Sequence, residues 1–159
     1  MVSDDSIREK IAQVIQAQAS KAVVFRWWVL GDDYSQWPGV LRAGSTDLDP
    51  ATSKKRIHAY VIKRETSEGT RRDPYRVKRI YRYQILAFHY FFMGTEENNS
   101  EKLFTAELDA ITAVLDDRAG LVDPSLQRAD PINWQTKINT GQFGETLHIG
   151  IGSLSLEPC

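Results

Sequence analysis

Two stretches of the chain repeat apolar residues at helical spacing, which predicts two amphipathic helices. The first covers 6–19 and opens at Ser6, which has the spacing of a capping box with Glu9. The second opens at a capping pair formed by Asn98 and Glu101. The apolar stripes are Ile7, Ile11, Val14 and Ile15 in the first helix, and Phe104, Leu108, Ile111 and Leu115, widened by Leu103 and Val114, in the second.

The stretch after the first helix is rich in β-branched and aromatic residues. Residues 21–31 read KAVVFRWWVLG, which predicts a strand that stops at its glycine. Residues 32–53 then mix Gly, Pro, Asp and Ser, which is typical of a long loop. In this loop Trp37 precedes Pro38, and a residue in that position is expected to be extended.

A long antiparallel hairpin is predicted for the middle of the chain. The strand-like segments 54–65 and 76–92 flank a turn region that contains Gly69 and Pro74. The first half of 76–92 alternates basic with apolar or aromatic residues, and its second half is apolar on both faces. We therefore expect the base of the hairpin to lie in the core and its basic part, 54–82, to project into solvent.

The second helix is expected to close at Gly120 and to be followed by a terminal hairpin. A loop is predicted over 121–131, a half-buried strand over 132–140, a turn over 141–144 and a last strand over 145–158.

The apolar phase changes along this last strand. Leu147, Ile149 and Ile151 point one way, whereas the leucines that follow Ser153 point the other way. A β-bulge at Gly152–Ser153 would absorb that change. Gly150 and Gly152 are then either part of the bulge or places where another backbone approaches closely.

These elements predict an α+β fold in a single domain over 1–159. We expect a mainly antiparallel sheet with a long β-hairpin arm and two amphipathic helices packed on one face, because each apolar helix face needs a cover. The sequence contains no internal repeat.

Charge is distributed unevenly along a chain whose formal net charge is only −1. Residues 54–82 contain eleven Lys and Arg against three Asp and Glu, so the rest of the chain is acidic. One interpretation is that the basic hairpin meets an acidic partner. The other is a solvated hairpin whose charges discourage unwanted strand pairing and need no ligand.

Composition excludes several classes of protein. A hydrophobic content of 42% indicates a globular chain, not a disordered one. Its apolar runs are far shorter than the ~20 residues of a membrane helix, and the acidic start is unlike a signal peptide, so neither a membrane location nor secretion is expected. The lone Cys159 rules out an internal disulfide, which fits a reducing compartment.

The sequence gives little sign of catalysis. His58, His89 and His148 each fall in a predicted strand and lack metal-ligand spacing, so no metal site is expected. Glu107 and Asp109 point in different directions on a helix and do not form an acid/base pair. No hydrolase, zinc-protease or nucleotide-loop motif occurs, and we expect neither a cofactor nor an enzyme.

Nucleic-acid binding is an alternative for the basic hairpin. The stretch RRDPYRVKRIYRY, residues 71–83, interleaves basic residues with Tyr75, Tyr81 and Tyr83. Basic residues neutralise phosphates and aromatic rings stack on bases. Against this, strand aromatics commonly serve packing, and a pI near 6.3 is low for a dedicated binder.

The order of elements resembles the tail terminator (tail completion) proteins of long-tailed bacteriophages. The resemblance rests on the N-terminal helix IREKIAQVI, the helix NNSEKLFTAELDAITAVL and the final turn and strand FGETLHIGIGSLSLEP. It spans nearly the whole chain and is sharpest over 98–115 and 143–157. The long loop 31–53 and the basic hairpin 54–82 depart from the lean family pattern.

The resemblance implies a structural protein of the virion, assembled in the host cytoplasm and placed at the head–tail junction. Six copies would form a ring that caps the tail tube and meets the head connector, and also the sheath if the tail is contractile. DNA would only pass through the channel, and no cofactor or catalysis is implied. Another neck component, such as a head-completion or stopper protein, is the second possibility.

Subunit or partner contacts are expected where this chain departs from the family pattern, since a ring built from heterologous interfaces needs complementary patches. The candidate interface residues are Trp37, Lys63, Arg64, Arg71, Arg72, Arg76, Lys78 and Arg79.

Overall fold

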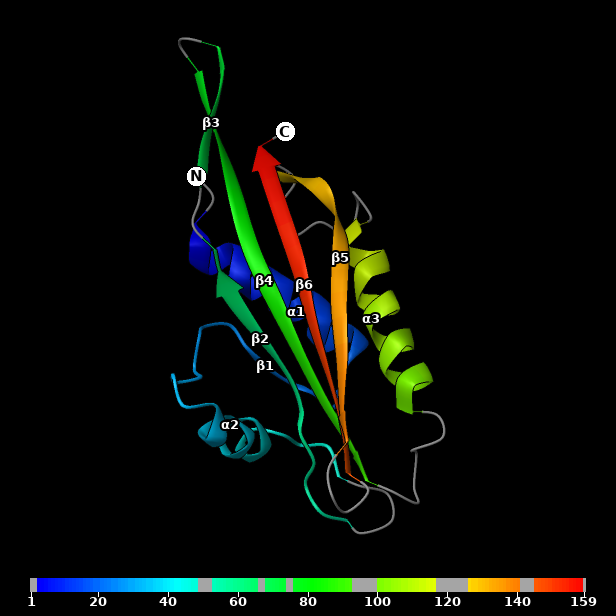
Figure 1. The fold of residues 1–159 in the computed structure, drawn as a ribbon. Coiled ribbons are helices and arrows are strands. Elements are labelled where there is room, and N and C mark those ends of the chain that lie inside the picture. The colour runs from blue at the N-terminus through cyan, green and yellow to red at the C-terminus, as the bar shows by residue number, and fades with distance from the viewer. Residues whose placement is uncertain are drawn as a thin grey trace.

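The computed structural model describes residues 3–48, 53–65, 68–73, 76–92, 100–116, 126–140 and 145–158 (Figure 1). The fold is α+β and its sheet is mainly antiparallel, as the sequence predicts. The helices are α1 (Asp4–Gln18), the 3₁₀ helix η1 (Tyr34–Gln36), α2 (Trp37–Ala43) and α3 (Ser100–Asp116). The strands are β1 (Val23–Phe25), β2 (His58–Arg64), β3 (Glu68–Asp73), β4 (Arg76–Phe92), β5 (Leu126–Thr140) and β6 (Glu145–Pro158).

The strands lie side by side in the order β1-β2-β4-β6-β5. Among the described strands the β1–β2 pair alone is parallel, and the other pairs are antiparallel. Strand β4 is the longest: its residues 83–89 pair with β2, 81–92 pair with β6, and 76–80 pair with β3. Strands β2 and β3 thus succeed one another along the same side of β4.

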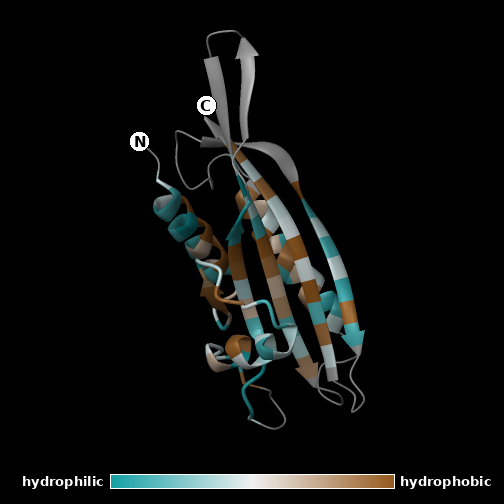
Figure 2. Ribbon diagram, turned by 60° about the vertical axis from the view of Figure 1, so that its left-hand side comes forward, coloured by the Kyte–Doolittle hydropathy of each residue, from teal (hydrophilic) through white to brown (hydrophobic). Residues whose placement is uncertain are grey.

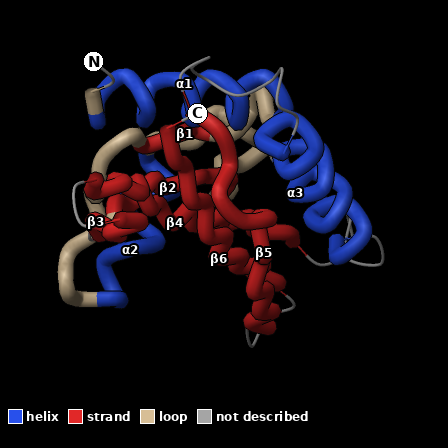
Figure 3. The backbone as a smooth tube through the Cα atoms, turned by 90° about the horizontal axis from the view of Figure 1, so that it is seen from above, coloured by secondary structure: helices blue, strands red, loops and turns tan. Residues whose placement is uncertain are grey.

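The central strands are buried on both faces. Helices α1 and α3 lie on one side of the sheet and α2 on the other (Figure 3). Figure 2 shows hydrophobic residues concentrated on the central strands. The core on the α1 and α3 side includes Ile7, Ile11, Ile15, Tyr83, Ile85, Phe91, Phe104, Leu108, Ile111, Leu115, Leu154 and Leu156. The core on the α2 side includes Leu30, Leu41, Ile57, Val61, Leu86, Phe88 and Tyr90.

The start of the chain differs from prediction in two details. Helix α1 begins at Asp4, and its cap is Ser3, whose side chain accepts a hydrogen bond from the Ser6 amide; the predicted cap at Ser6 is wrong. The strand predicted over 21–31 shortens to β1, because the backbone leaves the sheet at Arg26. There the Arg26 carbonyl accepts a hydrogen bond from the buried Arg8 guanidinium.

The prediction of a long loop over 32–53 is wrong over part of its length, since η1 and α2 lie within it. Trp37 is helical and not extended, with φ −59° and ψ −45°. Proline suits the first turn of a helix, and Pro38 is the second residue of α2. The Trp37 indole also donates to the Gly31 carbonyl at 2.7 Å and packs edge-on against Phe88. These tertiary contacts outweigh the local preference of a residue before proline.

The terminal hairpin is longer than predicted. Strand β5 begins at Leu126, inside the segment expected to be a loop, and includes Pro131. Its pairing with β6 shifts register between Arg128 and Asp130 and again between Asp130 and Asn133. A bulged edge strand tolerates proline because no ladder hydrogen bond is needed there.

The bulge predicted at Gly152–Ser153 is not present, because β6 keeps an unbroken register with β4. The apolar phase changes because both faces of the sheet are covered. Gly150 and Gly152 contact side chains and not another backbone: a Cβ at Gly152 would lie 2.8 Å from the Trp134 ring.

Three predictions fall outside the described residues: the cap at Asn98, the helix end at Gly120 and the turn over 141–144. Among the described helices, none combines the length and apolar character that crossing a lipid bilayer demands.

Candidate functional site

The three histidines of the chain lie side by side across three strands. His58 on β2 pairs with His89 on β4, which pairs in turn with His148 on β6. Residues at one level of a sheet point to the same face, so the three rings gather on the side of α3. All three side chains are buried. His148 has a different partner from the others, because its Nε2 lies 2.9 Å from the Ser100 hydroxyl.

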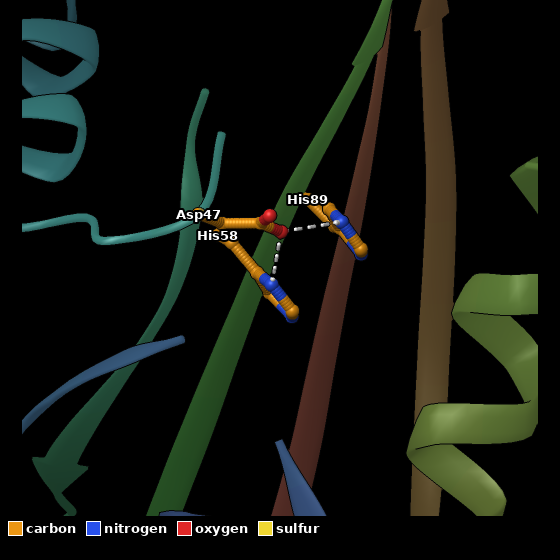
Figure 4. Close-up of side chains that lie close together, drawn as sticks. All are labelled: Asp47, His58 and His89. Carbon is orange, nitrogen blue, oxygen red and sulfur yellow. Dashed lines mark hydrogen bonds and ion pairs between the residues drawn. The ribbon is translucent and has the colours of Figure 1, made fainter. Parts of the chain in front are cut away.

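The other two histidines share a carboxylate from the segment after α2. Figure 4 shows Asp47 pointing toward a ring nitrogen of each. Its Oδ2 lies 2.9 Å from His58 Nδ1 and 3.8 Å from His89 Nε2. The two imidazoles stack face to face, with ring centroids 3.8 Å apart and an angle of 4° between the planes. We call Asp47, His58 and His89 the histidine–aspartate cluster.

Two acidic side chains and two further donors surround His58. Its Nε2 lies 2.7 Å from Glu107 Oε1, and the Tyr60 hydroxyl donates to that same oxygen. Arg56 Nε donates to Asp47 Oδ2 at 3.1 Å. Burial alone would lower the pKa of His58, but the hydrogen bonds to Asp47 and Glu107 raise it. Burial alone would raise the pKa of Asp47, but His58 and Arg56 lower it to about 2.

His89 has a different environment from His58. Burial, with the positive charges of His58 and Arg56, holds the pKa of His89 well below its usual value, so the ring is neutral. Neither ring nitrogen has a hydrogen-bond partner among the described residues, and neither does Asp47 Oδ1. Buried polar atoms normally have partners, so this arrangement is unusual.

A hollow of about 280 Å³ opens onto the cluster. It lies between the end of α1, the strands and α3, and it gives the cluster a route to solvent. The arrangement can do two kinds of chemistry: it can hold a proton between carboxylates at His58, or it can hold a cation between two imidazoles and a carboxylate. The hollow is lined by Gln18, Ala19, Ser20, Lys21, Leu103, Glu107, Phe91 and Arg56, with the three cluster residues.

The cluster was not predicted from the sequence. No metal site was expected, and no role was assigned to Asp47. The signal was the presence of a histidine in each of two strands predicted to pair. Only the register of that pairing, however, brings His58 opposite His89. Asp47 arrives from a segment whose path the sequence does not specify.

The structure brings together two of the predicted interface residues, Trp37 and Lys63. They line a second hollow, of about 480 Å³, with Trp28 and Tyr34. Trp37 packs against Tyr34 with ring centroids 4.6 Å apart, and the Lys63 ammonium lies 5.0 Å from the Trp28 ring. We call these four residues the aromatic patch; Tyr34 is 74% exposed.

The remaining interface candidates are placed elsewhere or lie outside the described side chains. Arg64 is directed to Asp4, with an N–O distance of 3.6 Å. The backbones of the other five belong to β3 and β4, and their side chains are outside the described ones. These five are Arg71, Arg72, Arg76, Lys78 and Arg79.

Asp4 anchors α1 to the sheet. Its two carboxylate oxygens accept hydrogen bonds from the Tyr83 hydroxyl at 2.6 Å and from Arg8 Nε at 2.9 Å. Partial burial would raise the pKa of Asp4, but these donors and nearby arginines lower it. A carboxyl group with a lowered pKa stabilises the folded state above its unfolded pKa, and this stability is lost as the pH falls through the folded value.

We expect Tyr83→Phe to weaken this anchor in a pH-dependent way. The variant should lose ~1.5–3 kcal/mol of unfolding free energy at pH 7, because a hydrogen bond to a charged acceptor is lost. The difference from wild type should shrink as the pH falls below the ordinary pKa of an aspartate and through the lower folded pKa of Asp4, because the carboxyl then becomes protonated in the folded protein as well. Urea unfolding at pH 7 and pH 3 measures this, with Tyr81→Phe on the same strand as the control. Equal losses at both pH values would contradict the role of Asp4.

Comparison with known proteins adds little to this picture. The sequence matches no model of a known protein family, and no curated protein matches it. One solved structure, whose name describes no function, aligns with all of this chain and with 97% of its own length. Its sequence is 17% identical and the TM-score is 0.48, a level of similarity from which no functional conclusion is drawn.

Proposed function

We propose that this protein is a structural subunit of a long-tailed bacteriophage. It would assemble as a ring, with six copies expected, that caps the tail tube and joins it to the head connector. The resemblance of the helices and the last strand to tail terminator proteins supports the identity of the assembly. Exposed apolar residues on the surface of the molecule support a function in assembly.

The observation that carries the proposal is the exposure of apolar residues beside both edges of the sheet. At the β1 edge, Trp27 is 49% exposed and packs against the Arg8 guanidinium of α1, which lies 4.2 Å from its ring. At the opposite edge, Ile138 on β5 is also 49% exposed. In the described chain β5 pairs with β6 alone, so it also offers unpaired backbone groups along its outer edge.

Two unlike surfaces on opposite edges suit a head-to-tail contact. Such a heterologous contact closes into a ring when the rotation between subunits permits it. In this proposal α1 and α3 pack as a pair on one face and leave both edges available to neighbours. The prediction that the whole of 54–82 projects is wrong, because His58–Ile62 of β2 are buried in the sheet. In this proposal the arm is only β3 with residues 76–80 of β4, which pair with β3 alone among the described strands, and five residues of strand extend ~17 Å. The arm would reach an acidic surface of a neighbouring subunit or of the next ring.

Electron microscopy of the purified protein and immunogold labelling of virus particles test this proposal. We expect rings in solution or on tail tubes, and label at the head–tail junction. Ile138→Lys should abolish the rings, because it places a charge at the β5 edge, whereas Asn139→Lys on the opposite face of that strand should be milder. The absence of the protein from virions would overturn the proposal.

The same assay tests the arm. Arg71→Glu with Arg72→Glu should weaken assembly at low salt. Lys21→Glu with Lys102→Glu, which changes the net charge equally at two exposed sites, should leave assembly intact. A gel-shift assay with DNA provides the contrast, since strong DNA binding by monomers would favour a nucleic-acid-binding module.

A further inference from the structure

We propose that Asp47, His58 and His89, with Glu107 as the fourth ligand, bind a divalent transition-metal ion, and that Zn²⁺ is the ion they fit best. The site would tie the segment after α2 to strands β2 and β4 and to helix α3. This inference concerns the buried cluster and does not depend on the proposed ring.

The distances in the cluster match a tetrahedral metal site. Zinc binds nitrogen and carboxylate oxygen at ~2.0–2.2 Å, so neighbouring ligands in a tetrahedron lie roughly 3.3 Å apart. Asp47 Oδ2 lies 2.9 Å from His58 Nδ1 and 3.8 Å from His89 Nε2, on either side of that value. One donor atom from each of the three residues lies within 4.8 Å of the others.

The polar atoms without partners supply the second, independent reason. His89 is only 6% exposed, and neither of its ring nitrogens has a hydrogen-bond partner among the described residues. Asp47 Oδ1 is also buried and also lacks a hydrogen-bond partner among the described residues. Leaving such atoms unsatisfied is costly, and a bound cation would satisfy the His89 ring nitrogen that it binds.

The ligand types select the class of ion. Two imidazoles suit Zn²⁺ and its first-row neighbours, whereas Mg²⁺ and Ca²⁺ prefer oxygen ligands. Two carboxylates, Asp47 and Glu107, offset the charge of the ion and of Arg56. The hollow of about 280 Å³ gives an entry path to the cluster.

Binding requires one local rearrangement. Parallel imidazoles 3.8 Å apart cannot both direct an in-plane lone pair at one ion, so one ring must turn about its Cβ–Cγ bond. Turning His58 also separates its Nε2 from Glu107 Oε1, which frees that oxygen to bind the ion. Binding should therefore break the stack of the two rings, and this gives a spectroscopic signature specific to the proposal.

Calorimetry and metal analysis of the full chain, stripped with a chelator and titrated with ZnCl₂, test the site. We expect one ion per chain with a dissociation constant of roughly 1 μM or lower. His89→Phe keeps a flat ring in the stack but removes the ligand, and it should weaken binding by more than ~100-fold, beyond the 10–100-fold typical of outer-shell changes. His148→Phe, which removes the third histidine of the row, and Cys159→Ser, which removes a competing thiol, should leave the affinity unchanged.

Nuclear magnetic resonance of the wild-type protein keeps the test valid even where a variant fails to fold. Zinc should shift the ring-nitrogen resonances of His58 and His89 and leave those of His148 in place. Co²⁺ should give the visible absorption of a four-coordinate site. The proposal is overturned if wild type takes up no zinc at ~100 μM, or if His89→Phe binds it as tightly as wild type does.

Discussion

His58→Ala should cost ~3–5 kcal/mol of unfolding free energy in metal-free protein, the range for breaking a buried ion pair by removing one partner. The imidazole stands between the carboxylates of Asp47 and Glu107, whose side chains are 3% and 15% exposed. Without it, two carboxylates remain close together in a poorly solvated site and lose the imidazole between them. Urea unfolding at pH 6 in the presence of a chelator measures the loss.

Two further variants show whether this loss comes from charge. Tyr60→Phe removes a neutral donor from the same Glu107 oxygen and should cost only ~1 kcal/mol. Adding Glu107→Gln to His58→Ala should recover part of the loss, since one uncompensated charge is then gone. A double variant that is less stable by the sum of both single losses would contradict the electrostatic explanation.

The second large effect is expected on the buried face of α3. Phe104→Ala should destabilise the protein by ~3–5 kcal/mol, because it leaves a cavity between the helix and the sheet. Phe104 is 2% exposed, packs with its ring centroid 5.2 Å from that of His148, and lies against Gly150. Thermal or urea unfolding measures the change.

The neighbouring residue on the same helix is the matched control. Leu103 is 43% exposed, so Leu103→Ala should change the unfolding free energy by no more than ~0.5 kcal/mol. Losses of similar size at the two positions would mean that α3 does not pack as described.

The sequence correctly predicted those elements in which the hydrophobic pattern along the chain matches the face that is buried in the fold. The stripe of Ile7, Ile11 and Ile15 has helical period, and that stripe is the face that α1 buries. The inner half of β4 is apolar on both faces because it is covered on both sides. In such segments the local pattern and the tertiary environment require the same residues, so reading one gives the other.

The sequence failed where distant contacts decide the outcome. Trp37 is helical because its indole reaches Gly31 and Phe88, which no local rule for a residue before proline anticipates. The histidine–aspartate cluster depends on the register of β2 against β4 and on the path of the segment that delivers Asp47. Neither the register nor this path can be predicted from the spacing of residues along the chain.

The strand order affects how the chain folds during its synthesis on the ribosome. Strand β6 follows every other described strand in the sequence, yet it lies between β4 and β5 in the sheet. Until residues 145–158 have left the exit tunnel, the long apolar flank of β4 has no permanent neighbour and is open to wrong associations. The sheet therefore cannot close before residues 145–158 have been made, and a nascent chain stalled before residue 145 should depend on chaperones to stay soluble.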